Sequence, residues 1–350
     1  MNLRLKSLID LFKSKDIDAL IVNCDVNIQY LTQFPAHESW LFVTPKQSFY
    51  ITDARYTLEA EKGLKGIQVV RFEKSLFHTV VELALKHKLG RIGFDETSVT
   101  LAQYKSFVQN LSKSLKLVAA NGLVENLREV KSREEILRVR QALKIHHEAL
   151  KLMKRVVKPG ITEQNVLEKL ENFVKVNRVG HSFSPIIASG PNSCFPHAKV
   201  TNRKIKNNEP VLLDFGIDYK GYKSDLTRMI FLGRIPQFVR DINEKVYCSQ
   251  QKAIRAIKAG IDAKLVDAQA RNYLKEYKLD QYFGHSLGHG VGLEIHENPR
   301  LSQGSKAILK EGMVVTVEPA VYIPHQFGIR LEEMVLVRKN DCEVLSVGIN

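Results

Sequence analysis

The stretch VLLDFGIDYKGYKSDLTR at residues 211–228 decides how the chain is organised. Apolar residues lead into Asp214, polar residues and a glycine follow, and a second strand pattern contains Asp225. A glycine after polar residues between two such patterns is typical of a β-hairpin. If Tyr219 and Lys220 form the turn, Asp214 faces Asp225 with Cβ atoms about 5 Å apart. Carboxylates that close repel, so one must be neutral or a divalent cation must lie between them.

The composition is that of an ordinary globular protein. At 350 residues the chain is long enough for two domains of about 150 residues. Residues 1–15 are amphipathic at helical spacing and lack the apolar core of a signal peptide. No run approaches the roughly 18 apolar residues of a membrane span. The four cysteines match neither a zinc site nor a disulfide framework, which predicts a reducing, cytoplasmic location.

The formal net charge of +14 has two explanations. It can indicate a polyanionic partner such as nucleic acid, or a lysine-rich solvated surface. The lysines are spread along the chain and no nucleic-acid motif accompanies them, which favours the second explanation.

The pattern of elements changes near Asn121 and Gly122. Residues 1–121 alternate between helical and strand patterns, which predicts a small α/β domain with a mixed sheet and no catalytic cluster. Residues 122–350 run helices, strands, helices, strands, beginning with a long helix capped by Ser132. We therefore expect an α+β second domain of two similar halves, although no repeat of individual residues is evident.

A histidine cluster lies in GHSLGHGVGLEIHENPR at residues 284–300. It holds His285, His289 and His296 of the 11 histidines in the chain. The glycines make a helix improbable and predict a loop leading into a strand, where the backbone can approach a site closely. The clustering favours a functional role over a surface pattern.

Two further strand patterns carry carboxylates. Glu318 lies inside the apolar run VVTVEPAVYI at 314–323, and a buried carboxylate needs a partner. Glu332 lies in FGIRLEEMVLV at 327–337, where it shares a strand face with Arg330. A structural Arg330–Glu332 ion pair would also explain this second segment.

Together, Asp214, Asp225, His289, Glu318 and Glu332 offer four carboxylates and one imidazole. This donor set suits two hard or borderline divalent cations, whose charge the four carboxylates balance. Two such cations can hold a bridging hydroxide and polarise a carbonyl, as amide hydrolysis requires.

These segments resemble the pita-bread metallopeptidases, in the branch of Xaa-Pro dipeptidases (prolidases) and aminopeptidase P. The motifs are LDFG at 213–216, SDLTR at 224–228, GHGVG at 288–292, VEP at 317–319 and GIRLE at 328–332. NIQYLT at 27–32 and TDARY at 52–56 are similar to the creatinase-like N-terminal domain of that branch, and VKSREEI at 130–136 to the start of its catalytic domain. The resemblance implies a creatinase-like domain over 1–121 and a pita-bread catalytic domain over 122–350.

The resemblance also implies residue roles. Metal ligands are expected at Asp214, Asp225, His289, Glu318 and Glu332, for two divalent ions, with manganese as first choice and cobalt, zinc or iron as alternatives. His197 and His296 are expected to be catalytic, and Glu318 to serve as proton shuttle as well. His285 and Arg300 are expected to contact substrate, and Arg330 to orient a carboxylate ligand.

The implied function is hydrolysis of Xaa-Pro bonds by a metal-bridging hydroxide, on peptides with proline at the second position. A homodimer without a membrane partner is expected. Arg300 suits capture of a dipeptide's free carboxylate, but aminopeptidase-type relatives also carry arginine there, so substrate length stays open. The alternative is a catalytically silent pita-bread protein that binds nucleic acid or the ribosome; such relatives have usually lost ligands, whereas this chain keeps all five.

Overall fold

The computed structural model describes residues 2–348 and separates into two compact units, Met1–Arg128 and Glu129–Asn350. The division falls at the end of helix α7 (Leu123–Glu129), whereas the change of pattern at 121–122 precedes that helix. Each unit has its own hydrophobic core. No helix in the described part of the chain is long and apolar enough to cross a membrane.

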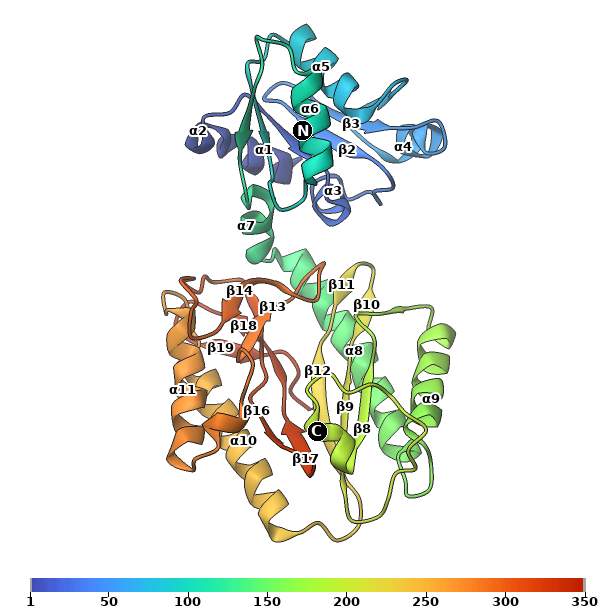
Figure 1. The fold of residues 1–350 in the computed structure, drawn as a ribbon, viewed down its shortest axis with the longest axis vertical. Helices are drawn as coiled ribbons and strands as arrows, with labels where there is room; N and C mark the ends of the chain where they lie inside the picture. Colours follow the sequence, from blue (N-terminus) through green and yellow to red (C-terminus); the bar gives the residue numbers. More distant parts are fainter. Residues whose placement is uncertain (1, 349–350) are drawn as a thin grey trace. The chain divides into compact units, whose positions relative to one another are not determined.

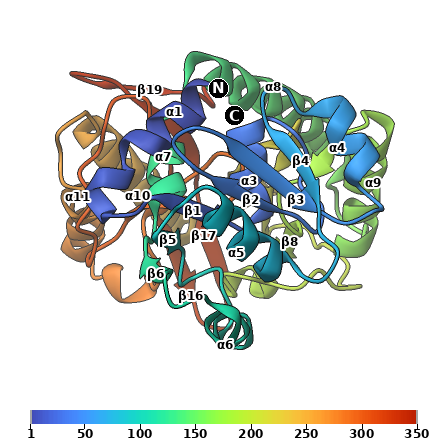
Figure 2. The same cartoon turned by 90° about the horizontal axis from the view of Figure 1, so that it is seen from above.

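The first unit is built on one mixed sheet in the order β4-β3-β2-β1-β5-β6 (Figure 2). β1, β2 and β3 pair antiparallel, and the remaining neighbours pair parallel. Its core contains Trp40, Phe42 and Phe49 from the central strands. The elements are α1 (Leu3–Asp10), α2 (Phe12–Lys15), β1 (Ala19–Val22), α3 (Asp25–Thr32), β2 (Trp40–Val43), β3 (Ser48–Thr52), α4 (Thr57–Gly63), β4 (Gln68–Arg71), α5 (Leu76–Lys86), β5 (Arg91–Phe94), α6 (Leu101–Asn110) and β6 (Lys116–Ala119).

The second unit consists of two halves, each a helix pair followed by strands. In Figure 1 the strands lie between the helix pairs α8–α9 and α10–α11. The first half contains α8 (Arg133–Val156), α9 (Glu163–Val176), β7 (Gly180–His181), β8 (Ile186–Ser189), β9 (Pro210–Phe215), β10 (Ile217–Tyr219), β11 (Tyr222–Lys223) and β12 (Leu226–Phe231). The second contains α10 (Gln237–Ala256), α11 (Ala263–Glu276), β13 (Gly288–Gly290), β14 (Glu297–Leu301), β15 (Val314–Val317), β16 (Ala320–Ile323), β17 (Phe327–Arg330), β18 (Glu333–Val337) and β19 (Cys342–Val344).

The turn between the two helices repeats in both halves, at residues 158–162 and 258–262. Gly160 and Gly260 have φ of 93° and 87°, which favours glycine. Their N–H groups donate to Ile205 and Leu309 carbonyls, each at 2.8 Å. The sequence KPGIT thus has a counterpart in KAGID, so the expectation that no residue-level repeat exists is wrong.

The hairpin that contains Asp214 and Asp225 has a different register from the expected one. The turn residues are Lys220 and Gly221, with φ of 52° and 86°, because a tight hairpin turn of this kind needs positive φ at both positions. Asp214 therefore lies opposite Thr227, not opposite Asp225. A shift of two residues leaves every side chain on its original face, so both aspartates still point to the same side of the sheet.

The two C-terminal strand patterns are each broken into two strands. β15 and β18 pair in one sheet, and β16 and β17 pair in another. Glu318 lies between β15 and β16, where Pro319 has no N–H to donate to a ladder, and Glu332 lies between β17 and β18. The expectation of continuous strands is wrong, and both glutamates are at the breaks.

Candidate metal centre

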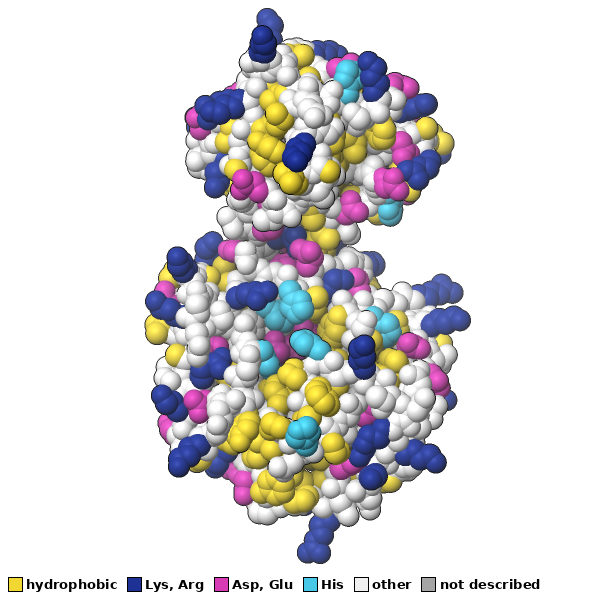
Figure 3. Space-filling model, viewed as in Figure 1, with side chains coloured by type: hydrophobic (Ala, Val, Ile, Leu, Met, Phe, Trp, Pro, Cys, Tyr) yellow, Lys and Arg dark blue, Asp and Glu magenta, His cyan; other side chains and the backbone are white. Residues whose placement is uncertain are grey.

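All of the site residues predicted from the sequence line one cavity of about 700 Å³ in the second unit. They are His197, Asp214, Asp225, His285, His289, His296, Arg300, Glu318, Arg330 and Glu332. Figure 3 shows histidine side chains beside acidic ones in the middle of this unit. Segments from both halves therefore meet at a single place.

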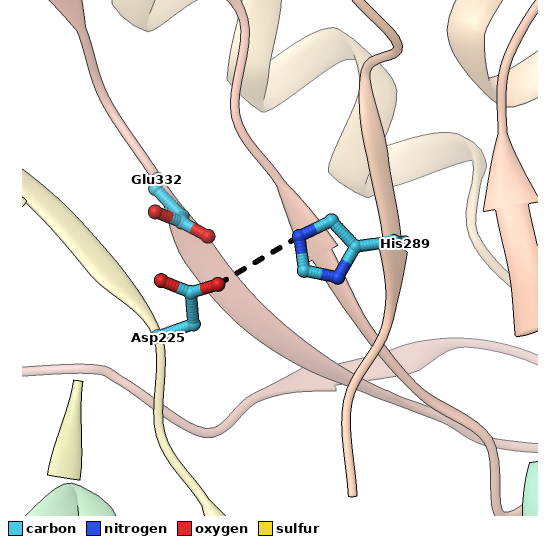
Figure 4. A group of neighbouring side chains, drawn as sticks. All are labelled: Asp225, His289 and Glu332. Atoms are coloured by element: carbon cyan, nitrogen blue, oxygen red, sulfur yellow. Dashed lines mark ion pairs between the residues drawn. The ribbon is translucent and has the colours of Figure 1, made fainter. Parts of the chain in front are cut away.

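Asp225, His289 and Glu332 form the tightest cluster of potential metal ligands. One ligand atom from each lies within 4.8 Å of the others (Figure 4). His289 Nε2 lies 3.7 Å from Asp225 Oδ2 and 3.3 Å from Glu318 Oε1. Three of the five predicted ligands thus form one group, and Glu318 contacts it through His289.

Glycines on β13 bring His289 close to the neighbouring strand. A Cβ at Gly288 would lie 2.0 Å from the Thr316 carbonyl oxygen. The N–H of His289 donates to Thr316 Oγ1 at 3.1 Å, and its Nδ1 lies 3.1 Å from the Gly290 carbonyl oxygen. Because a carbonyl only accepts, Nδ1 carries a proton, and in the neutral ring Nε2 is the free ligand atom.

Asp214 is paired with Arg330 instead of standing in the tight cluster. Arg330 Nη2 donates to Asp214 Oδ2 at 2.6 Å, and Nε donates to Thr227 Oγ1 at 2.9 Å. Thr227 in turn donates to Glu332 Oε2 at 2.9 Å. Arg330 therefore pairs with Asp214 and not with Glu332, and it orients two carboxylates, one of them through Thr227.

The buried acids are electrostatically unbalanced. Burial, together with the charge of Glu332, raises the pKa of Asp225 well above its ordinary value. Burial and the charges of Glu318 and Asp214 do the same to the pKa of Glu332. Burial also raises the pKa of Asp214, although Arg330 opposes this. Like charges in a low-dielectric site explain these directions.

His289 and Glu318 stabilise each other's charge. Burial alone would lower the pKa of His289, but the Glu318 carboxylate raises it above its ordinary value. Burial alone would raise the pKa of Glu318, but the hydrogen bond with His289 leaves it below the ordinary value. The two directions agree with an ion pair in the absence of metal.

The residues present fit a divalent cation. Asp214 Oδ1 and Glu332 Oε1 are buried and have no hydrogen-bond partner in the described part of the chain. Such orphaned carboxylate oxygens are costly unless a cation binds them. Asp225, His289 and Glu332 can hold one ion, and the free oxygen of Asp214 is available beside them.

The remaining predicted residues form the walls of the cavity. His285 Nδ1 lies 2.8 Å from the Ser286 carbonyl oxygen, and Nε2 lies 3.1 Å from the Tyr322 hydroxyl. Because the Ser286 carbonyl only accepts, Nδ1 carries a proton, and in the neutral ring Nε2 accepts from Tyr322. Burial lowers the pKa of His285. His296 packs edge-on to His289 at 4.4 Å between ring centroids, and burial and His289 lower its pKa. Arg300 lies opposite His289 in the β13–β14 pair.

Thr227 and Tyr322 also contact the site residues, and neither was predicted from the sequence. Arg330 Nη1 donates to the Tyr322 hydroxyl at 2.5 Å, and burial raises the pKa of Tyr322 to about 12. Strand alternation places Thr227 on the face of Asp225, so that signal was available. Tyr322 lies beyond the strand break at Glu318, and alternation across a break carries no information.

Comparison with known proteins identifies the family. The model for metallopeptidase family M24 matches residues 138–339, and the model for the creatinase/prolidase N-terminal domain matches residues 4–130.

Similar proteins cover nearly the whole chain. An uncharacterized peptidase of Bacillus subtilis is 36% identical, with 97% of this chain and 96% of the relative covered. The solved structure of an Xaa-Pro dipeptidase from Bacillus anthracis has a TM-score of 0.94 at 32% identity, covering 99% of this chain and 97% of that chain. An X-Pro aminopeptidase from Thermotoga maritima has a TM-score of 0.87 at 29% identity, covering 96% and 97%.

The matches span both units of the fold. They confirm the α+β pita-bread fold behind a creatinase-like mixed-sheet domain that the sequence motifs implied. The chain therefore belongs to metallopeptidase family M24 and is a metallopeptidase with a creatinase/prolidase N-terminal domain.

Proposed function

We propose that this enzyme hydrolyses Xaa-Pro peptide bonds, on peptides with proline at the second position. The observation that carries the proposal is the convergence of every predicted site residue on one cavity. Relatives named Xaa-Pro dipeptidase and X-Pro aminopeptidase support the choice of substrate. A cytoplasmic homodimer stays a prediction, and so does manganese over cobalt, zinc or iron.

The donor set suits two divalent cations held by Asp214, Asp225, His289, Glu318 and Glu332. Bound cations would supply Lewis acidity toward the scissile carbonyl and lower the pKa of water. Oxygen-rich donors with one imidazole favour hard or borderline ions.

The chain's own side chains orient the reactants. Arg330 fixes Asp214 directly and Glu332 through Thr227, so the carboxylates are held before substrate arrives. We assign His197 and His296, which are exposed to the cavity, to contact with the substrate carbonyl region. Glu318 is the proton shuttle in this proposal, because a carboxylate beside the reacting groups can accept a proton and return it to the leaving amine.

Arg300 is the residue through which a dipeptidase can be distinguished from an aminopeptidase by experiment. It is exposed and lines the cavity on β14, opposite His289. A guanidinium there can bind the free carboxylate of a dipeptide in a bidentate manner.

The test compares manganese-loaded wild type, Arg300→Ala and the control Arg255→Ala, an exposed arginine on α10. For a dipeptidase, Arg300→Ala raises KM for Xaa-Pro at least about tenfold, because a hydrogen bond to a charged group is lost. Hydrolysis of Xaa-Pro-Yaa changes little. Unchanged dipeptide kinetics would remove the carboxylate role, and no hydrolysis of either peptide by wild type would refute the Xaa-Pro proposal.

A further inference from the structure

Glu163, in the first turn of α9, is a fully buried carboxylate outside the metal site, with 0% exposure. Its Oε1 accepts from Ser189 N at 2.7 Å and Ser189 Oγ at 2.8 Å. Its Oε2 accepts from Asn192 Nδ2 at 2.9 Å, Thr201 N at 3.1 Å and Thr201 Oγ1 at 2.7 Å. So many donors around one buried charge form a satisfied network, which fixes the geometry of its members.

The donors belong to the two ends of one loop. Ser189 is the last residue of β8 and directly precedes the segment 190–200, and Thr201 directly follows that segment. This segment forms one wall of the cavity through its residues Pro196, His197, Ala198, Lys199 and Val200. One side chain therefore ties down both ends of the loop that carries His197.

The same loop contacts the metal site from its other side. The Pro196 carbonyl accepts from Arg330 Nη1 at 3.1 Å, and Arg330 holds Asp214 at 2.6 Å. Ser193 Oγ accepts from Gly328 N on β17 at 2.8 Å. A shift of the loop would therefore reach both His197 and the arginine that orients a carboxylate.

In the second half of this unit, other residues hold the corresponding loop. Ala263 occupies the position of Glu163, since the N–H of each donates to a carbonyl of the segment facing the turn, Arg203 at 3.1 Å and Ala307 at 2.9 Å. Here the buried Asp267 pairs with Arg271 at 3.0 Å and accepts from Leu287 N at 3.2 Å. Arg271 also donates to the carbonyls of Phe283 and His285, at 2.8 and 3.0 Å.

We propose that Glu163 is a positioning residue that anchors the 190–200 loop, and with it His197 and the Pro196 carbonyl, in the geometry that catalysis requires. The kinetic consequence rests on the proposed function, whereas the anchoring does not. Asp267 provides an internal comparison, because it holds the loop of His285 in the other half.

Hydrogen exchange measured by mass spectrometry tests the anchoring in the full-length, manganese-loaded protein. In Glu163→Gln the amide has one acceptor oxygen, and its NH2 group faces a donor, so the contacts of either Ser189 or Thr201 are lost. Exchange over 189–201 should rise at least about tenfold, with 283–289 unchanged. Asp267→Asn should give the reverse pattern.

Leu170→Ala on the same helix is the control for general destabilisation, because Leu170 is buried and outside the network. Leu170→Ala should raise hydrogen exchange across the unit, with no larger increase at 189–201 than elsewhere. Both variants are compared at the same number of degrees below their own Tm. If the 189–201 segment then exchanges equally fast in Glu163→Gln and Leu170→Ala, the anchoring role is overturned.

Kinetics and metal analysis test the positioning. Glu163→Gln should lower kcat/KM for an Xaa-Pro substrate about tenfold to a hundredfold while bound metal per chain stays at the wild-type level, because misplacement of a distant group alone has effects of this size. Leu170→Ala should stay within about twofold of wild type below its Tm. If Glu163→Gln exchanges faster at 189–201 but its kcat/KM is that of wild type, the positioning role is overturned. A wild type without Xaa-Pro hydrolysis would refute the proposed function instead, and the exchange pattern would still decide the anchoring.

Discussion

The two halves of the catalytic unit share a scaffold but differ in what they contribute to the site. Both have a helix pair joined by a turn at Gly160 or Gly260, with the same backbone hydrogen bond at 2.8 Å. The first half contributes two aspartates from one hairpin, whereas the second contributes His289, Glu318 and Glu332 from separate segments. The repeated turn positions the backbone in both halves. The side chains proposed to carry out the chemistry occupy positions at which the two halves differ.

Polar contacts of the site cross between the halves. Arg330 from the second half binds Asp214 from the first, and Thr227 from the first binds Glu332 from the second. Asp225 and Glu332 keep raised pKa values, because burial and neighbouring carboxylates outweigh these contacts. The halves are therefore joined at the site by charges that are only partly balanced until a cation binds.

The largest expected effect comes from removing a proposed metal ligand that the first half contributes. Asp225→Asn should lower kcat/KM at least about a thousandfold, since metal catalysis supplies several kcal/mol. It should also lower bound metal, measured by elemental analysis. Asp218→Asn is the matched control, because Asp218 lies on the same hairpin but pairs with Lys223 at 2.6 Å. Full metal occupancy and turnover in Asp225→Asn would refute its role as a ligand.

A smaller effect is expected from pH on the metal-free protein. The folded-state pKa values of Asp225 and Glu332 are raised, so the folded protein holds protons that the unfolded chain releases above about pH 4. The unfolding free energy therefore falls as pH rises through that window, by about 1.4 kcal/mol per carboxyl for each unit of pKa shift. His289, whose pKa is also raised, acts in the same direction.

Metal binding should cancel this loss, because a cation stabilises the deprotonated ligands. The Tm difference between manganese-loaded and chelator-treated protein should therefore grow from pH 5 to pH 8. Scanning calorimetry in matched buffers measures it. A difference that does not depend on pH would contradict the unbalanced-charge explanation.

The smallest expected effect concerns the shared scaffold. Gly160→Ala and Gly260→Ala should each lower the unfolding free energy by about 1–2 kcal/mol, because φ near 90° strains a residue with a Cβ. Urea unfolding measures both, and kcat/KM should change little. A Cβ at either position meets no atom within 4 Å, so the cost is conformational. A clear inequality between the two variants would break the equivalence of the turns.

Local patterns predicted much of the fold. Ser132 caps its helix by accepting from the residue three positions on, as its place before the long helical run indicated, and Thr162 caps the next helix in the same way. The hairpin register was not predictable, because turns at 219–220 and at 220–221 both preserve the strand alternation. The break at Glu318 had a signal in Pro319, which cannot donate to a strand ladder, whereas the charged run at 330–333 did not show where the strand would end.

The order of residues along the chain specifies which residues can carry charge, which glycines allow close approach, and which segments can be strands or helices. The partners of the charged side chains are set by how the folded chain packs. Arg330 binds Asp214, 116 positions away, instead of its neighbour Glu332, and Glu163 accepts from Ser189, 26 positions later. Which charged groups pair depends on their distance and burial after packing, and spacing along the chain does not specify either one.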